Sequence, residues 1–168
     1  MKVFKDAFSG DEMFSDSFPH VKVYGDSMWE VKSKYVPKDD NVVIHEKGAF
    51  DADEPEDTGD IEMVNNMIEN FKLNEVVMTK KDFMGMIKPY LKRGAGWLKE
   101  KNPERVKGFM SGATEAVKFI GGRFDEFQIY AGNSYDMECG CAFAYQKEQC
   151  DEAPTFLFFA DCMIEQKF

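Results

Sequence analysis

The sequence is poor in the residues from which active sites are built. Only two histidines occur, His20 and His45, both in the first third of the chain. The chain has no HExxH motif, no GxGxxG fingerprint, no Walker loop and no Ser-His-Asp pattern. Since a nucleophilic side chain needs a neighbouring base or cation to activate it, we expect a protein without enzymatic activity.

Long apolar runs are also absent. No segment approaches the roughly 20 apolar residues that cross a bilayer. The first residues, MKVFKDAFSG, lack the apolar core of a secretory signal. We therefore expect a soluble, cytoplasmic protein that has no membrane partner.

Cysteine is scarce and confined to the last fifth of the chain, at Cys139, Cys141, Cys150 and Cys162. The cysteines of a disulfide framework would be spread along a small secreted chain, so we expect reduced thiols. A zinc site built from these residues is the alternative. Structural zinc sites, however, favour cysteine pairs with roughly two to four residues between them, whereas one glycine separates Cys139 from Cys141. We therefore expect no zinc site.

Apolar and acidic residues are abundant. Sixteen Phe and 43% hydrophobic residues in a chain of 168 predict one globular domain with a real core, spanning residues 1–168. The net charge of −10 and a pI near 4.7 argue against binding to the phosphate backbone of nucleic acids. We expect no specific nucleic-acid partner.

The charge is unevenly distributed along the chain. Residues 80–123 contain eleven Lys and Arg and four Asp and Glu, a net charge of +7, which leaves −17 for the remainder. This segregation predicts a cationic face that binds an acidic partner, with an ordinary solvated helix face as the alternative. The candidate docking residues are Lys88, Lys92, Arg93, Lys99, Arg105 and Lys107.

The basic segment has the pattern of a helical hairpin over residues 80–124. Thr79 and Asp82 resemble a capping box at its start, and Asn102 and Pro103 are the N-cap and first-turn residues of a second helix. Apolar residues at helical spacing predict the buried faces: Phe83, Ile87, Leu91 and Leu98 in the first helix, and Val106, Met110, Ala113, Val117, Ile120 and Phe124 in the second.

Alternating or continuous apolar residues predict strands on either side of this hairpin. The candidates are residues 1–4, 20–24, 28–36, 64–73, 127–131, 141–145 and 155–160. The last is apolar throughout, which is typical of a strand buried on both faces. Together with the hairpin, these strands predict an α+β fold of largely antiparallel strands.

Residues 37–60 interrupt the strands and are rich in acids. They cannot bury enough apolar surface to offset the entropy of ordering, so we expect a mobile loop. Its clustered carboxylates could bind Ca²⁺ weakly, with a solvated linker as the alternative. The candidate ligands are Asp51, Asp53, Glu54, Glu56 and Asp57. The EF-hand pattern is not met, because Pro55 takes a ligand position and Glu56 replaces the required glycine.

Three segments carry a family resemblance: DEMFSD at residues 11–16, PERVKGFMSGA at residues 103–113 and FDEFQIYAG at residues 124–132. In this order and at this spacing, they make the chain resemble the translationally controlled tumour protein family from end to end. The family's fold is a β-tent with a projecting helical hairpin. Here residues 49–53 replace the family's Asn-x-Ser-x-Glu element, and Phe168 stands where many animal members end in cysteine.

The resemblance implies a non-enzymatic cytosolic adaptor that supports growth signalling. The implied partners are tubulin and microtubules, a Ras-like small GTPase and translation elongation factors, with weak Ca²⁺ binding and no required cofactor. It also implies that Glu12, in the DEMFSD turn, contacts the GTPase, with an acid satisfied within the turn as the alternative. Because the family's core is similar to that of methionine sulfoxide reductases, a thiol-based reductase is the alternative function.

Overall fold

The computed structural model describes residues 1–38, 62–136 and 138–168. The expected acidic loop lies outside the described residues, apart from its first two positions, and so do all five candidate Ca²⁺ ligands. Within the described ranges, every strand pairing is antiparallel. Helices and antiparallel sheets together confirm the α+β fold class.

A six-stranded sheet lies at the centre of the fold, in the order β3-β4-β10-β9-β8-β7. Its strands are β3 (His20–Val23), β4 (Met28–Lys32), β10 (Thr155–Phe159), β9 (Ala142–Tyr145), β8 (Gln128–Ala131) and β7 (Asn74–Val76). All five residues of β10 are buried. This confirms the prediction that the apolar segment near the end of the chain is a strand covered on both faces.

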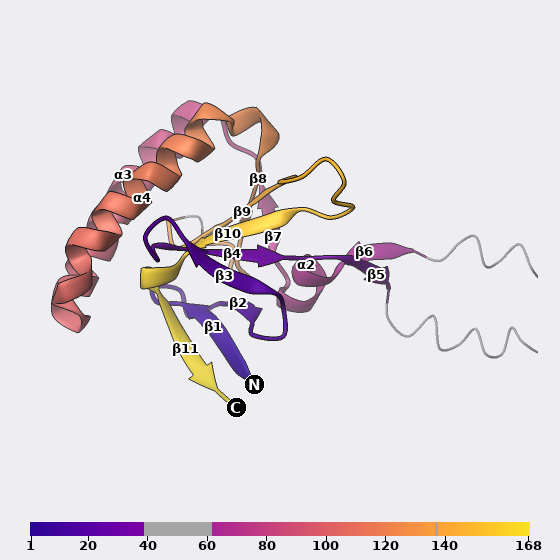
Figure 1. Cartoon of the computed structure of the whole chain (residues 1–168), viewed down its shortest axis with the longest axis horizontal. Helices are drawn as coiled ribbons and strands as arrows, with labels where there is room; N and C mark the ends of the chain where they lie inside the picture. Colours follow the sequence, from indigo (N-terminus) through magenta and orange to yellow (C-terminus); the bar gives the residue numbers. More distant parts are fainter. Residues whose placement is uncertain (39–61, 137) are drawn as a thin grey trace, which may run out of the picture.

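A smaller sheet in the order β11-β1-β2 carries both ends of the chain (Figure 1). Its strands are β1 (Lys2–Asp6), β2 (Glu12–Ser15) and β11 (Met163–Lys167), while β5 (Tyr35–Pro37) and β6 (Met63–Asn65) form a separate pair. Strand β2 corrects the interpretation of DEMFSD as a turn. Phe14 lies opposite Phe4 in the sheet, and their rings stack with centroids 4.4 Å apart, so this segment buries apolar surface as a strand does.

A helix replaces most of the strand predicted for residues 64–73, of which the first two positions lie in β6. Helix α2 (Asn66–Phe71) is capped by Asn65, whose side-chain oxygen accepts hydrogen bonds from the amides of Met67 at 3.0 Å and Ile68 at 3.1 Å. The prediction is wrong because this cap satisfies the first helical amides and outweighs the apolar pattern of a short segment. The single strand predicted over residues 28–36 is likewise divided, into β4 and β5.

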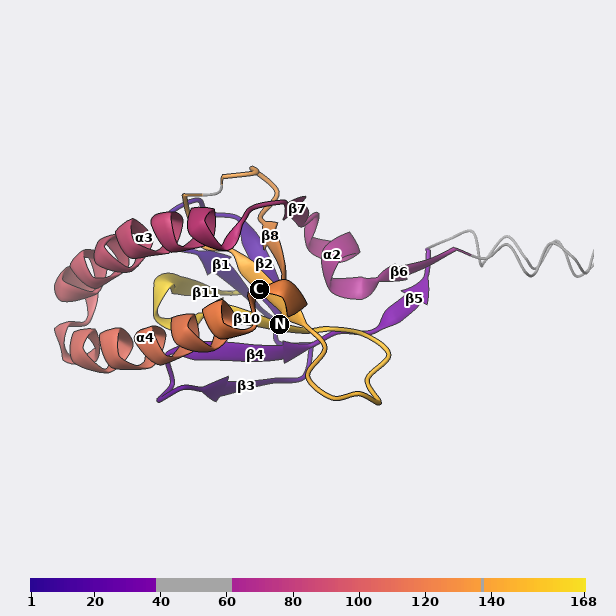
Figure 2. The same cartoon turned by 90° about the horizontal axis from the view of Figure 1, so that it is seen from above.

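The predicted hairpin consists of α3 (Lys80–Lys101) and α4 (Val106–Gly122), which lie side by side along the central sheet (Figures 1 and 2). Thr79 and Asp82 form the predicted reciprocal capping box. The start of the second helix differs from the prediction, because Asn102 makes no side-chain capping hydrogen bond and the 3₁₀ turn η2 (Pro103–Arg105) precedes α4. Two further 3₁₀ turns are η3 (Phe124–Glu126) and η4 (Ala160–Cys162).

The two faces of the central sheet bury alternate residues of each strand, as a period of two requires. In β10, Leu157 and Phe159 pack with the hairpin, whereas Phe156 and Phe158 pack with β1, β2 and α2. The central sheet is therefore a middle layer, with the hairpin on one side and the small sheet and α2 on the other.

The apolar stripe of α3 is buried as predicted, and that of α4 mostly so. Val106 and Phe124 are half-buried, and Met110 is 37% exposed, whereas its neighbour Phe109 is fully buried. Gly94 of α3 lies opposite Phe109. A Cβ added to Gly94 would come within 3.2 Å of the Phe109 ring and 2.7 Å of the Cys162 Sγ. Glycine at this position therefore lets α3 approach α4 and η4 closely.

Candidate partner-binding surfaces

Four lysines form a line along the solvent side of α3, which we call the lysine stripe: Lys81, Lys88, Lys92 and Lys99. All four are exposed. With about 100° of rotation per residue, they fall within about 40° of one line, and with a rise of about 1.5 Å per residue they extend over about 27 Å. A Cβ added to the adjacent Gly85 or Gly96 would meet no atom within 4 Å, so neighbouring side chains leave the stripe accessible.

Arg93 is turned away from the lysine stripe. Its guanidinium lies over the ring of Phe8, 4.2 Å from the centroid, and its Nη1 is 3.9 Å from the Sγ of Cys139. A guanidinium stacked on an aromatic face contributes to packing as well as to charge. Arg93 therefore links α3 to the loop between β1 and β2, although it is a predicted docking residue.

Arg105 is also engaged within the chain. Its Nε and Nη2 donate hydrogen bonds of 2.9 and 2.8 Å to the two carboxylate oxygens of Asp161 in η4, and these bonds are the main reason that its pKa is raised. Such a bidentate pair is stronger than a single contact. Of the predicted docking residues, Lys88, Lys92, Arg93, Lys99 and Lys107 are exposed, and none of these four lysines is in an ion pair within the described part of the chain.

Glu12 is the first residue of β2 and is exposed. It lies opposite Lys5, where the register of the two strands shifts. Its neighbour Asp11 is held in place, since the Asp11 carboxylate accepts hydrogen bonds from the amide (3.1 Å) and the hydroxyl (2.6 Å) of Ser134. The candidate GTPase contact thus stands on a strand end that is fixed to the loop after β8.

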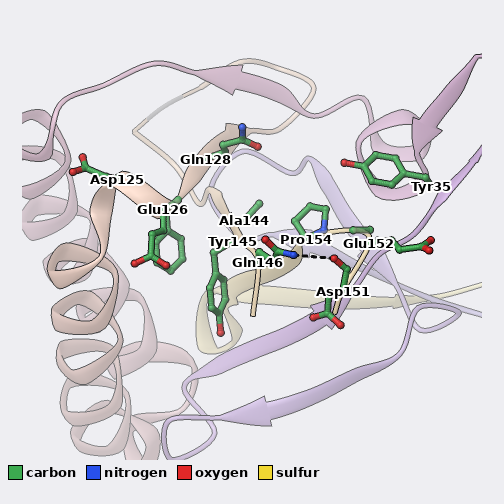
Figure 3. Close-up of a pocket in the computed structure, with 12 residues that line it drawn as sticks. Tyr35, Asp125, Glu126, Gln128, Ala144, Tyr145, Gln146, Asp151, Glu152 and Pro154 are labelled. Carbon is green, nitrogen blue, oxygen red and sulfur yellow. Dashed lines mark hydrogen bonds between the residues drawn. The ribbon is translucent and has the colours of Figure 1, made fainter. Parts of the chain in front are cut away.

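An acidic groove lies at one end of the central sheet and has a volume of about 340 Å³ (Figure 3). Its carboxylates come from Asp125, Glu126, Asp151 and Glu152. The stacked rings of Phe127 and Tyr145, 4.7 Å apart, also line it, and burial raises the pKa of Tyr145 to about 12. No pattern in the sequence marks this groove, because only the register of β8, β9 and β10 brings these separate segments together.

The buried thiols do not form an activated nucleophile. Burial raises the pKa of Cys139 to about 11 and those of Cys141 and Cys162 to about 12, so each remains a neutral thiol at physiological pH. Cys150 alone is exposed. Within residues 1–38, 62–136 and 138–168, no group of three or more His, Cys, Asp or Glu could hold a metal ion. This environment gives no support to the reductase alternative.

In the described ranges, no helix combines the length and the apolar character needed to cross a bilayer.

Several known proteins are similar to this chain in sequence and fold over their whole length. A family model described as translationally controlled tumour protein matches residues 1–164. Translationally-controlled tumor protein homologs of Theileria parva and Dictyostelium discoideum are 33% and 32% identical to this chain, and each alignment covers 100% of both sequences. Among solved structures, the protein p23fyp of Schizosaccharomyces pombe is 28% identical with a TM-score of 0.78, covering 100% of both chains. The structure from Caenorhabditis elegans, 24% identical with a TM-score of 0.67, covers 100% of this chain and 99% of that one and shows likeness of fold.

The layered sheets and the basic hairpin define the class of this protein as an α+β, β-tent fold. The whole-length matches make the assignment specific, and the chain belongs to the translationally controlled tumour protein family.

Proposed function

We propose that this chain is a non-catalytic cytosolic adaptor whose lysine stripe binds acidic partner surfaces, chiefly tubulin in microtubules. The observation that carries the proposal is the exposure of every lysine between residues 80 and 123. Since the whole chain has a net charge of −10, an acidic partner would repel it in any other orientation. The lysine stripe must therefore face the partner when the two surfaces come within about 8 Å of each other, the screening length at physiological ionic strength.

A charge-reversal variant tests this surface. Lys88→Glu, Lys92→Glu and Lys99→Glu together should weaken co-sedimentation with microtubules at least about tenfold, because three attractive contacts become repulsive. The matched control reverses three exposed lysines outside the hairpin, Lys22, Lys32 and Lys34, and has the same net charge. Equal binding by the two variants, or wild-type binding that is insensitive to salt, would exclude the stripe as the docking surface.

We further propose that Glu12 contacts a Ras-like small GTPase. Because Glu12 is exposed at the start of β2, Glu12→Val should weaken binding to the nucleotide-free GTPase and change the free energy of unfolding by less than about 0.5 kcal/mol. Asp16→Val is the control, since Asp16 is an exposed acid just beyond the other end of the same strand. Unchanged affinity of the Glu12 variant would remove this residue from the contact.

Weak Ca²⁺ binding is the third part of the proposal, and it rests on the clustered acids of the loop. Because these carboxylates do not follow the EF-hand pattern, they should bind Ca²⁺ with a Kd on the order of 10⁻⁴ to 10⁻³ M. Calorimetry on the full chain and on a variant lacking residues 48–58 would test this, because the deletion should remove the heat of binding. Submicromolar affinity for Ca²⁺ would contradict weak binding by acids that do not follow the EF-hand pattern.

Translation elongation factors are the remaining proposed partners. Precipitation of the chain from a cytosolic extract, followed by detection of the elongation factors, tests their association. If the lysine-stripe variant still retains them, they use a different surface from tubulin, and if the wild-type chain does not retain them, this part of the proposal is wrong.

A further inference from the structure

Strand β11 forms an open edge of the small sheet. Among the strands of residues 1–38, 62–136 and 138–168, it pairs with β1 on one side only, with Gln166 opposite Val3 and Ile164 opposite Lys5. Beyond Met163, every residue of β11 is exposed, including Ile164 at 47%, and Phe168 directly after the strand is 66% exposed. In Figure 1 the strand runs down to the C-terminus beside β1. Open strand edges are templates for pairing with another chain.

The hydrogen bonds to β1 determine which backbone groups face outwards. The amide of Phe168 donates to the carbonyl oxygen of Met1 at 2.8 Å, and the amino group of Met1 lies 3.4 Å from the carbonyl oxygen of Phe168. Since inward and outward groups alternate in an antiparallel pair, Ile164, Gln166 and Phe168 direct their amides and carbonyls to β1. Glu165 and Lys167 must therefore direct theirs to solvent.

We propose that β11 pairs with β11 of a second copy of this chain, antiparallel and with the two-fold axis at Gln166. In this register Glu165 lies opposite the partner copy's Lys167, and Ile164 lies opposite its Phe168. Both Glu165–Lys167 pairs join residues whose backbone groups face outwards, so they can exchange hydrogen bonds, while the apolar pairs occupy the closer, non-hydrogen-bonded positions. Every cross-strand pair from Ile164 to Phe168 is then complementary.

The charges on this edge favour the same register. Lys167 lies opposite Lys2 in β1, and like charges directly opposite each other are unfavourable. A second copy would place Glu165 on the other side of Lys167, where its carboxylate offsets this repulsion. Within the described ranges, neither Glu165 nor Lys167 is in an ion pair. A register centred on Glu165 would instead place two glutamates opposite each other.

The edges of the central sheet lack this complementarity. At β7, the hydroxyl of Tyr135 donates to the carbonyl oxygen of Glu75 at 3.3 Å and covers part of the edge. At β3 the sequence His20-Val21-Lys22-Val23 contains no acid to pair with its lysine. Because only five residues of each chain meet at β11 and both copies are acidic, the association should be weak, with a Kd on the order of 10–100 µM.

Charge exchange tests the pairing on the full-length chain by sedimentation equilibrium. Glu165→Lys or Lys167→Glu creates two like-charge pairs in each dimer, so either variant should associate at least about tenfold more weakly than wild type. The double variant, with both changes, should recover wild-type affinity. Glu115→Lys and Lys118→Glu on α4 are the controls, because both residues are exposed and the substitutions change the net charge equally.

A mixture of the two single variants gives the sharpest result. One copy then carries two lysines and the other two glutamates, so the mixed dimer regains both opposite-charge pairs and should form although neither variant associates alone. The proposal is overturned if wild type stays monomeric up to about 1 mM, tenfold above the weakest expected Kd. It is also overturned if the mixture is no tighter than its components, or if the controls weaken association equally. A wild-type chain that remains monomeric but binds a foreign strand at β11 would likewise exclude self-pairing.

Discussion

Replacing Gly112 with alanine should destabilise the contact between α4 and the turn that joins β3 to β4. A Cβ at this position would overlap the hydroxyl of Ser27 and the carbonyl oxygen of Tyr24, and would approach the Ser27 Cβ to 2.8 Å. The Ser27 side chain cannot simply rotate away, because it is buried and its hydroxyl donates to the carbonyl oxygen of Gly108 at 3.2 Å. Even if it did, the backbone oxygen of Tyr24 would still block the methyl group.

The magnitude combines three effects. Overpacking costs about 1–3 kcal/mol, loss of the Ser27 hydrogen bond costs about 1 kcal/mol, and alanine in a helix regains about 1 kcal/mol relative to glycine. The free energy of unfolding should therefore fall by about 1–3 kcal/mol. At the central value of about 2 kcal/mol, the Tm of a domain of this size should fall by about 4–8 °C.

Thermal unfolding followed by circular dichroism measures the effect. The matched control is Gly96→Ala in α3, where an added Cβ meets no atom within 4 Å and the helix should gain about 0.5–1 kcal/mol. Opposite signs for the two variants are the expected result. If Gly112→Ala is as stable as wild type or more so, the helix does not pack on the turn in the way described.

Three further results are expected. Arg105→Lys should lower the free energy of unfolding by about 1–2 kcal/mol in urea titrations, because lysine cannot reproduce the bidentate contact with Asp161, and an unchanged midpoint would contradict this. A maleimide reagent should label native protein at Cys150 alone, and rapid labelling of Cys150→Ser would show that the other thiols are accessible. The pKa of Cys141 is raised by burial to about 12, above about 8.5 for an unfolded thiol. The contribution of the neutral Cys141 thiol to stability is therefore complete below about pH 8.5 and is lost as the pH rises towards 12. Cys141→Ala should make the free energy of unfolding fall less steeply with pH in that window.

Long, regular patterns were predictable from the sequence, and short ones were not. The hairpin follows from a capping box and apolar residues at helical spacing, and β10 follows from a continuous apolar run. Helix α2 has only six residues, and its N-cap asparagine outweighs an apolar pattern that suits a strand equally well. Strand β11 is mostly polar because one edge and much of its surface face solvent, so it has no apolar signal to detect.

The candidate surfaces show the same limit. The charge of the hairpin is visible in the sequence, since its lysines lie close together along the chain. The acidic groove is not, because it joins segments that only the sheet register brings together. The contacts of Arg93 and Arg105 were also unpredictable, since their partners, Phe8 and Asp161, lie far away in the sequence.

Arginine and lysine have different roles in the hairpin. The chain has only three arginines, all in residues 80–123, and each is engaged: Arg93 with Phe8, Arg105 with Asp161, and Arg123 with Phe119 and Glu126. The lysines of the same segment are all exposed. A planar guanidinium stacks on rings and binds carboxylates bidentately, whereas a hydrated ammonium on a flexible stem retains its charge in solvent. The arginines can therefore fix the hairpin while the lysines stay available to a partner, so reversing the lysine stripe can change binding without loosening the fold.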